Sequence, residues 1–126
     1  MRRRIADPLA AVNTGSYSPA LRVGPWILVS GQGPLRPDGS VIEGDIATQT
    51  RATLHNIRRL VEAAGGSMDQ VVQCTCYIHD IDEFPEFDTA YRAAFSEPYP
   101  TRTTIEAGLD GILVEIDAMA YIGDDR

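Results

Sequence analysis

The residues best suited to chemistry stand in two segments near the end of the chain, 100–104 (Pro-Thr-Arg-Thr-Thr) and 114–120 (Val-Glu-Ile-Asp-Ala-Met-Ala). If both segments are strands, alternate side chains point to the same side of a sheet. The face that we expect to be exposed then carries Arg102, Thr104, Glu106, Glu115, Asp117 and Met119. The opposite face is mostly small and apolar, which predicts a core on that side. A guanidinium binds a carboxylate through two parallel hydrogen bonds, so the exposed face is typical of a site for a small carboxylate.

The charge balance bears on the partners that the chain could bind. Its 126 residues include 18 Asp and Glu against 11 Lys and Arg, which gives a formal net charge of -7. Nucleic-acid surfaces need clustered basic residues, and the one such block is residues 2–4 (Arg-Arg-Arg), which is more typical of a chain terminus. We therefore expect no nucleic-acid partner. Hydrophobic residues make up 44% of the chain, which argues against disorder and predicts a single domain over residues 1–126.

The cysteines and the hydropathy bear on the compartment. Cys74 and Cys76 are two residues apart, a spacing that seldom permits a disulfide, and no cluster of zinc ligands surrounds them. We expect two buried thiols in a reducing compartment. No signal peptide is apparent, and no run approaches the ~20 apolar residues of a membrane span. These features predict a cytoplasmic protein without membrane contact.

Two helices are predicted from the spacing of apolar residues. Residues 45–64 repeat apolar side chains every 3.6 residues, with Asp45 as a cap and two glycines at the end. A second helix is expected to begin at Asp82 or Glu83 and to stop before the prolines at 98 and 100.

The strands are predicted from runs rich in β-branched and aromatic residues, 26–31 and 71–79, followed by the two segments described first. Residues 1–25 look irregular and turn-rich, with a short edge strand near residues 3–5. The order β-α-β-α-β-β predicts an α+β fold in two layers, with both helices on one face of the sheet. The other face, with Leu28, Met119 or the cysteines on it, would be too apolar for water. We expect another copy of the chain to cover it.

Several familiar sites are not supported. His55 and His79 lie on different elements without metal-ligand spacing, and nothing favours a Ser-His-Asp or Cys-His arrangement. The Gly31-Gln32-Gly33 run lacks the longer glycine spacing and the lysine of a phosphate loop.

Four sequence motifs stand in order along the chain. They are GSYSPA at 15–20, VSGQGPL at 29–35, GDIATQT at 44–50, and PTRTT at 100–104 with VEIDA at 114–118. Over roughly residues 14–121 the chain resembles the RidA family, also called the YjgF family, of enamine/imine deaminases. The resemblance implies a chorismate-mutase-like α+β fold and a homotrimer with sites in clefts between subunits. It also implies hydrolysis of 2-imino acids, such as 2-iminopropanoate, to 2-keto acids and ammonia without a cofactor.

The resemblance assigns roles to particular residues. Arg102 matches the carboxylate clamp, and Glu115 matches a glutamate that positions the attacking water. Thr104 stands where the family often has cysteine and where the backbone does the binding. Tyr17 and Ser30 match positions that line the cleft. A further position, Gly31, allows close approach of the backbone to a ligand.

Two features depart from the family pattern. Asp88 stands where asparagine is common, either as a helix-surface carboxylate or as a substrate-binding residue that changes the substrate preference. The loop 108–111 is short. Its Asp110-Gly111 pair alone predicts a hairpin turn, whereas the resemblance implies that the last strand inserts between earlier ones.

Two alternative functions stay open: a non-catalytic trimeric protein that binds small keto or imino acids, and a deaminase for another substrate such as 2-aminomuconate. A ribonuclease, an activity attached to some relatives, is disfavoured by the acidic charge balance.

Overall fold

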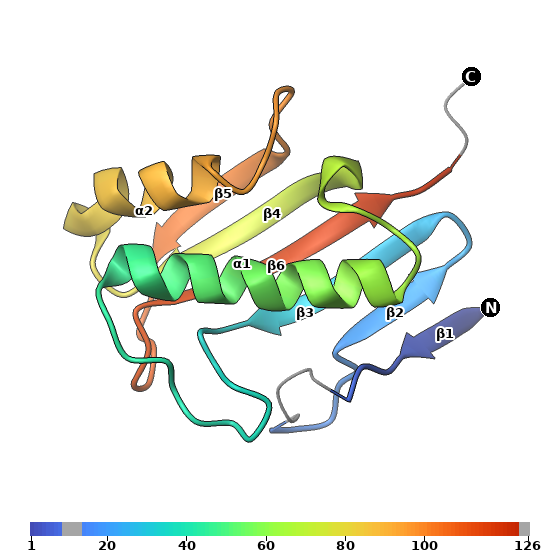
Figure 1. Cartoon of the computed structure of the whole chain (residues 1–126), viewed down its shortest axis with the longest axis horizontal. Helices are drawn as coiled ribbons and strands as arrows, with labels where there is room; N and C mark the ends of the chain where they lie inside the picture. Colours follow the sequence, from blue (N-terminus) through green and yellow to red (C-terminus); the bar gives the residue numbers. More distant parts are fainter. Residues whose placement is uncertain (9–13, 124–126) are drawn as a thin grey trace.

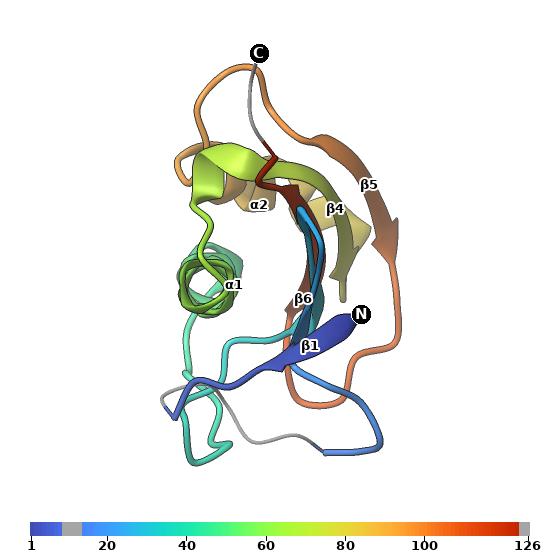
Figure 2. The same cartoon turned by 90° about the vertical axis from the view of Figure 1, so that its right-hand side faces the viewer.

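The structure is a computed structural model that describes residues 1–8 and 14–123. In these residues the chain forms a six-stranded sheet with two α-helices on the same face (Figure 1, Figure 2). The elements are β1 (Arg2–Ile5), β2 (Ala20–Val23), β3 (Trp26–Gln32), α1 (Ile46–Ala63), β4 (Val71–Ile78), α2 (Phe84–Arg92), β5 (Thr101–Glu106) and β6 (Val114–Tyr121). Two 3₁₀ turns, η1 (Met68–Gln70) and η2 (Ile81–Glu83), precede β4 and α2. The two-layer α+β prediction is confirmed.

The position of β6 defines the topology. The strand order is β1-β2-β3-β6-β4-β5, so β6 lies in the middle of the sheet between β3 and β4. All neighbouring strands are antiparallel except β4 and β5. The hairpin that the Asp110-Gly111 pair predicts is therefore wrong as a pairing, and the insertion that the family resemblance implies is correct.

The N-terminal region is more regular than the sequence indicates. The edge strand near residues 3–5 is present as β1, but β2 was missed and pairs with β3. Gly24, with φ of +56°, and Pro25 form the tight turn between β2 and β3. Three strands therefore precede α1, whereas the sequence indicated only the strand at 26–31 and a short edge strand. The part of the irregular prediction that covers residues 9–13 lies outside the described residues.

The two cysteines lie on the helix-facing side of β4, where both are buried and free of disulfides. Burial raises the pKa of the Cys74 thiol to about 11 and also raises that of Cys76. The prediction of two buried thiols is confirmed, while the idea that they line the uncovered face is wrong.

The face of the sheet away from the helices is partly apolar. Its exposed large side chains include Trp26, Leu28, Ile105 and Tyr121. Trp26 and Tyr121 pack edge to face, with ring centroids 4.8 Å apart. We call these four residues the open-face patch.

Among the described residues, neither helix has the length and apolar character that a membrane span needs.

Helix α1 packs its apolar face in the core and also hydrogen-bonds the backbone of neighbouring loops. Its N-cap, Asp45, accepts a hydrogen bond from the Thr48 N–H at 2.8 Å, and its apolar face is buried as predicted. Two polar side chains on the same helix are also buried. Gln49 bonds the Ile42 carbonyl and the Leu113 N–H, and Asn56 donates to two carbonyls of the loop after β3.

Replacing Asn56 with alanine should lower the free energy of unfolding by about 1–3 kcal/mol, because two partly buried carbonyls, of Gly33 and Leu35, lose their donor. Urea denaturation at one fixed protein concentration measures the change. The neighbouring exposed His55→Ala should change stability by no more than about 0.5 kcal/mol. Equal losses in the two variants would contradict a clamping role for Asn56.

Candidate active site in two halves

Arg102 and Glu115 lie on opposite faces of the sheet. On β4, Cys74 pairs with Arg102 of β5 and with Ala118 of β6, and Cys74 and Ala118 are buried on the helix side. The next β4 residue pairs with Thr103 and Asp117, which therefore point the other way. The prediction that Arg102 and Thr104 share a face with the β6 carboxylates is wrong. The β6 part of that prediction, with its apolar residues in the core, is confirmed.

The arginine is held by aromatic rings of α2. The Arg102 guanidinium carbon lies 4.6 Å from the ring centroid of Tyr91, 5.3 Å from that of Phe84 and 5.6 Å from that of Phe87. A guanidinium over aromatic faces is attracted electrostatically, and more strongly where water is scarce. Three rings therefore fix the position of the cation, while its N–H groups lie in the plane of the guanidinium itself.

Asp88 completes this half of the site. Arg102 Nη1 donates to Asp88 Oδ1 at 2.8 Å, and both side chains are only partly exposed. The two residues line a cavity of about 350 Å³ that we call the arginine cavity, with Tyr91, Arg92, Tyr99 and Pro100 as its other lining residues. The structure thus places an ion pair, rather than a lone cation, at the predicted carboxylate clamp.

Thr104 and Glu106 of β5 lie on the helix side of the sheet, like Arg102. Thr104 pairs with the buried Cys76, and its hydroxyl oxygen is buried without a hydrogen-bond partner in the described part of the chain. Glu106 Oε1 accepts a hydrogen bond from the Ile81 N–H at 3.0 Å, in the turn that leads to α2. Glu106 therefore has a structural role at the start of that helix.

Glu115 lies against a break in the β3 strand. The register between β3 and β6 shifts between Val29 and Gln32, so Ser30 and Gly31 form a bulge. A Cβ atom added to Gly31 would lie 2.5 Å from Glu115 Oε2. Real Cβ atoms do not approach other atoms so closely, so the carboxylate occupies the space that glycine leaves.

The environment of Glu115 favours its protonated form. Burial, and then the negative charge of Asp117, raise the pKa of Glu115 above its usual value. Asp117 is fixed beside it because its Oδ1 accepts a hydrogen bond from the Thr75 N–H at 3.1 Å. A carboxylate whose pKa is moved towards neutrality is better suited to take a proton from water.

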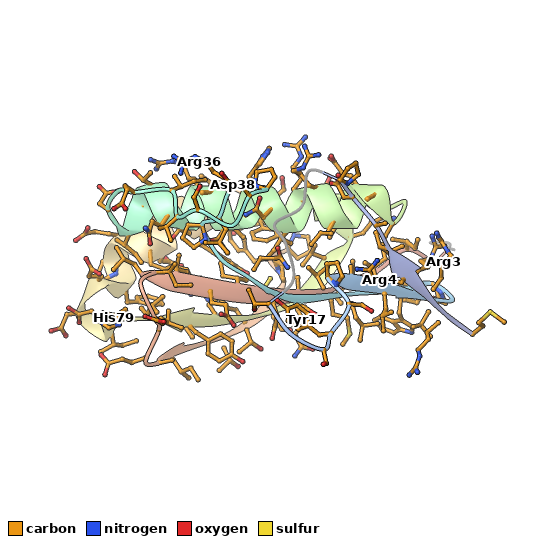
Figure 3. The ribbon with its side chains drawn as sticks, turned by 90° about the horizontal axis from the view of Figure 1, so that it is seen from below. Arg3, Arg4, Tyr17, Arg36, Asp38 and His79 are labelled. Atoms are coloured by element: carbon orange, nitrogen blue, oxygen red, sulfur yellow. The ribbon has the colours of Figure 1, made fainter. Side chains whose placement is uncertain are left out.

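Ser30 ties the segment that carries Tyr17 to the sheet. The Ser30 hydroxyl donates to the Ser18 carbonyl at 2.6 Å, and the Ser30 N–H donates to the Pro19 carbonyl at 2.9 Å. Tyr17 is exposed and lies on the side of the sheet away from the helices (Figure 3). Ser30, Gly31, Thr75 and Asp117 also line a hollow of about 330 Å³ on that face. Gly31 and Glu115 thus meet beside Ser30 in one half of the candidate site, and Tyr17 lies on the same side of the sheet.

Other parts of the molecule do not add to these two halves. The described residues contain no group of three or more His, Cys, Asp and Glu side chains that could hold a metal ion. His55 and His79 are exposed on separate elements, with His79 at the end of β4 (Figure 3). A larger groove of about 480 Å³ runs between α1 and α2, but none of the predicted site residues lines it.

Residues 8–122 match the family model described as "Endoribonuclease L-PSP". A RutC family protein of Pyrococcus abyssi is 37% identical over 110 residues, which cover 85% of this chain and 87% of that protein. The 2-iminobutanoate/2-iminopropanoate deaminase of Escherichia coli K12 is 31% identical over 125 residues, covering 95% and 98% of the two chains. The chain belongs to the RidA (YjgF) family.

The fold agrees with this membership. The crystal structure of RidA from the Antarctic bacterium Psychrobacter sp. superposes with a TM-score of 0.89 at 32% identity, covering 95% of this chain and 99% of that one. The sheet with β6 in its middle is thus part of a fold that this chain shares with that RidA protein.

Sequence reasoning missed the surroundings of Arg102. Phe84, Phe87 and Tyr91 stand at helical spacing within the second predicted helix, and this spacing does put them on one face. That spacing does not reveal that an arginine from another strand packs on the same rings. Arg102 stands among threonines at the start of β5, and nothing in that pattern indicates its aromatic partners.

Replacing Asp117 with asparagine should lower the pKa of Glu115, because the charge next to it disappears while an oxygen remains to accept the Thr75 hydrogen bond. The pKa should stay above the usual glutamate value, since burial is its larger cause. An NMR titration of the Glu115 side chain measures both values. An unchanged pKa would show that water or counter-ions screen the two carboxylates from each other.

Proposed function

We propose that this protein hydrolyses 2-imino acids, such as 2-iminopropanoate, to 2-keto acids and ammonia. The proposal is supported by the 31% identity with a deaminase of these compounds and by the chemistry of the two half-sites. The observation that carries it is that the chain holds a guanidinium fixed in a cavity on one face of the sheet and, on the other face, a carboxylate of raised pKa against Gly31. These are the two groups that hydrolysis of an anionic imine requires.

Each group has a defined task. Arg102 binds the substrate carboxylate and thereby places the imine carbon. Glu115 holds a water molecule and takes a proton from it as the water oxygen attacks that carbon. Glu115 then gives this proton to the nitrogen of the tetrahedral intermediate. The intermediate's hydroxyl group releases its own proton as the carbon–nitrogen bond breaks, and ammonia and the keto acid leave. The chain contains no lysine, so a Schiff base on a lysine side chain is not available and water must be the nucleophile.

We infer that the complete site needs a second chain. Because Arg102 and Glu115 lie on opposite faces of one sheet, a single chain does not bring them together. We propose a homotrimer in which the arginine cavity of one subunit meets the Glu115 face of its neighbour. A ring of three uses two different surfaces at each contact, which fits two half-sites that differ. The open-face patch (Trp26, Leu28, Ile105 and Tyr121) supplies apolar surface for such contacts.

The alternatives predict different behaviour. A binding protein for keto or imino acids would use Arg102 but would not need Glu115. A deaminase for a larger dicarboxylate such as 2-aminomuconate would use a second cation, and Arg92 lines the same cavity as Arg102. The name of the matched family model makes RNA a necessary negative control, although the net charge of -7 disfavours RNA binding.

Glu115→Gln should lower kcat for 2-iminopropanoate by about 10²–10⁴, because glutamine keeps the shape but cannot take a proton. In the wild type, kcat/KM should fall as the pH drops through the raised pKa of Glu115, and the variant should lose this acid limb. The measurement is keto-acid release from freshly generated imine, with calorimetry of pyruvate binding beside it.

The matched control is Glu106→Gln, which removes one carboxylate on the other face and keeps an acceptor for the Ile81 N–H. It should retain most of the activity. Full activity in Glu115→Gln would remove the general base from the proposal, and pyruvate binding without any acceleration in the wild type would favour the binding protein.

Co-assembly of two inactive variants tests the shared site. Arg102→Ala and Glu115→Gln should each be inactive alone, but random mixed trimers contain interfaces with both native groups and should regain about a quarter of wild-type activity. Light scattering must show an assembly larger than one 13.7 kDa chain. A monomeric mass, or co-expressed variants that stay inactive although they co-assemble, would contradict a site between subunits.

A further inference from the structure

The ion pair in the arginine cavity has a consequence for which ligands can bind there. Arg102 and Asp88 have side chains that are 22% and 33% exposed, so a ligand in the cavity can reach both charges. In the described residues the guanidinium makes one side-chain hydrogen bond, from Nη1 to Asp88 Oδ1. A guanidinium carries five N–H donors, so most of its donors remain for a ligand.

The two charges are held in a fixed relation. Asp88 lies on α2, and the rings that pack on the Arg102 guanidinium belong to the same helix, at positions 84, 87 and 91. The helix therefore positions both the anion and the cation. A ligand that enters the cavity meets a preformed pair of opposite charges whose contacting atoms are 2.8 Å apart.

Such a pair discriminates between ligands by charge. A keto acid presents its carboxylate to Arg102 but offers nothing to Asp88, whose like charge repels it. A ligand with a cationic nitrogen on the carbon next to its carboxylate presents one charge to each partner. The protonated form of a 2-imino acid, an iminium, has this arrangement, and so does an amino acid.

We infer that Asp88 is a specificity-determining residue that selects ligands with a cationic nitrogen next to the carboxylate over keto acids. This inference rests on the proposed function for the identity of the substrate. Within that function Asp88 contacts the protonated imine nitrogen, which keeps the substrate in its more electrophilic form. The same selection expels the product, because the keto acid has lost the group that Asp88 binds.

The test compares two probes with the same three-carbon skeleton, pyruvate and L-alanine, by calorimetry with the intact protein. In Asp88→Asn the affinity for pyruvate should rise and that for L-alanine should fall, so that their ratio changes about tenfold or more. With Asp88 neutral, the charged groups left in the cavity lining are the guanidinium groups of Arg92 and Arg102, which favours any anion.

Glu86→Gln is the matched control, because it removes an exposed carboxylate from the same helix but does not line the cavity. It should leave the affinity ratio unchanged. Far-UV circular dichroism and light scattering must show that both variants keep the wild-type fold and assembly.

The outcomes separate this inference from the proposed function. A wild type that hydrolyses 2-iminopropanoate, together with an Asp88→Asn variant whose affinity ratio is unchanged, overturns the inference and leaves the function. A changed ratio in a protein that never accelerates imine loss overturns the function and leaves the charge selection. If neither probe binds the wild type or Asp88→Asn, the Arg102–Asp88 pair is only structural and the inference is wrong.

Discussion

The strict alternation of side chains along β6 is the constraint on which the rest of the molecule depends. Its even-numbered residues, Val114 to Ala120, are buried under the helices, and the strand lies in the middle of the sheet. The odd-numbered residues must then face the other way. That side places Glu115 over the β3 bulge and Asp117 against the β4 backbone. The packing of the core and the position of the candidate base, Glu115, are thus both set by the alternation of side chains along β6.

Much of this arrangement follows from the sequence where one face of an element is fully buried. Helix α1 and strands β3, β4 and β6 have periodic apolar residues, and their predicted limits agree with the structure to within a few residues. The short strand β2 escaped prediction because it has four residues and a mixed pattern, and its pairing with β3 depends on the turn at Gly24.

The faces of β5 could not be assigned from sequence for a different reason. An edge strand has a neighbour on one side only, and its burial depends on what lies above it. Here α2 supplies three aromatic rings, so an arginine takes the covered position and Ile105 the exposed one. The alternation of side chains alone cannot tell whether Arg102 or Ile105 faces the helices. The motifs nevertheless identified Arg102 and Glu115, because family patterns record position along the chain and not the side of a sheet.

The central place of β6 also affects the order in which the protein can fold during synthesis. β6 comes after every strand with which it pairs, so β1–β3 and β4–β5 exist as two separate pieces until residues 114–121 are available. Until then β3 and β4 each present an unpaired backbone edge, a known template for unwanted pairing with other chains. Contacts between segments so distant in sequence also form slowly. The nascent chain therefore depends on its last strand to remove its two most aggregation-prone edges in a single step.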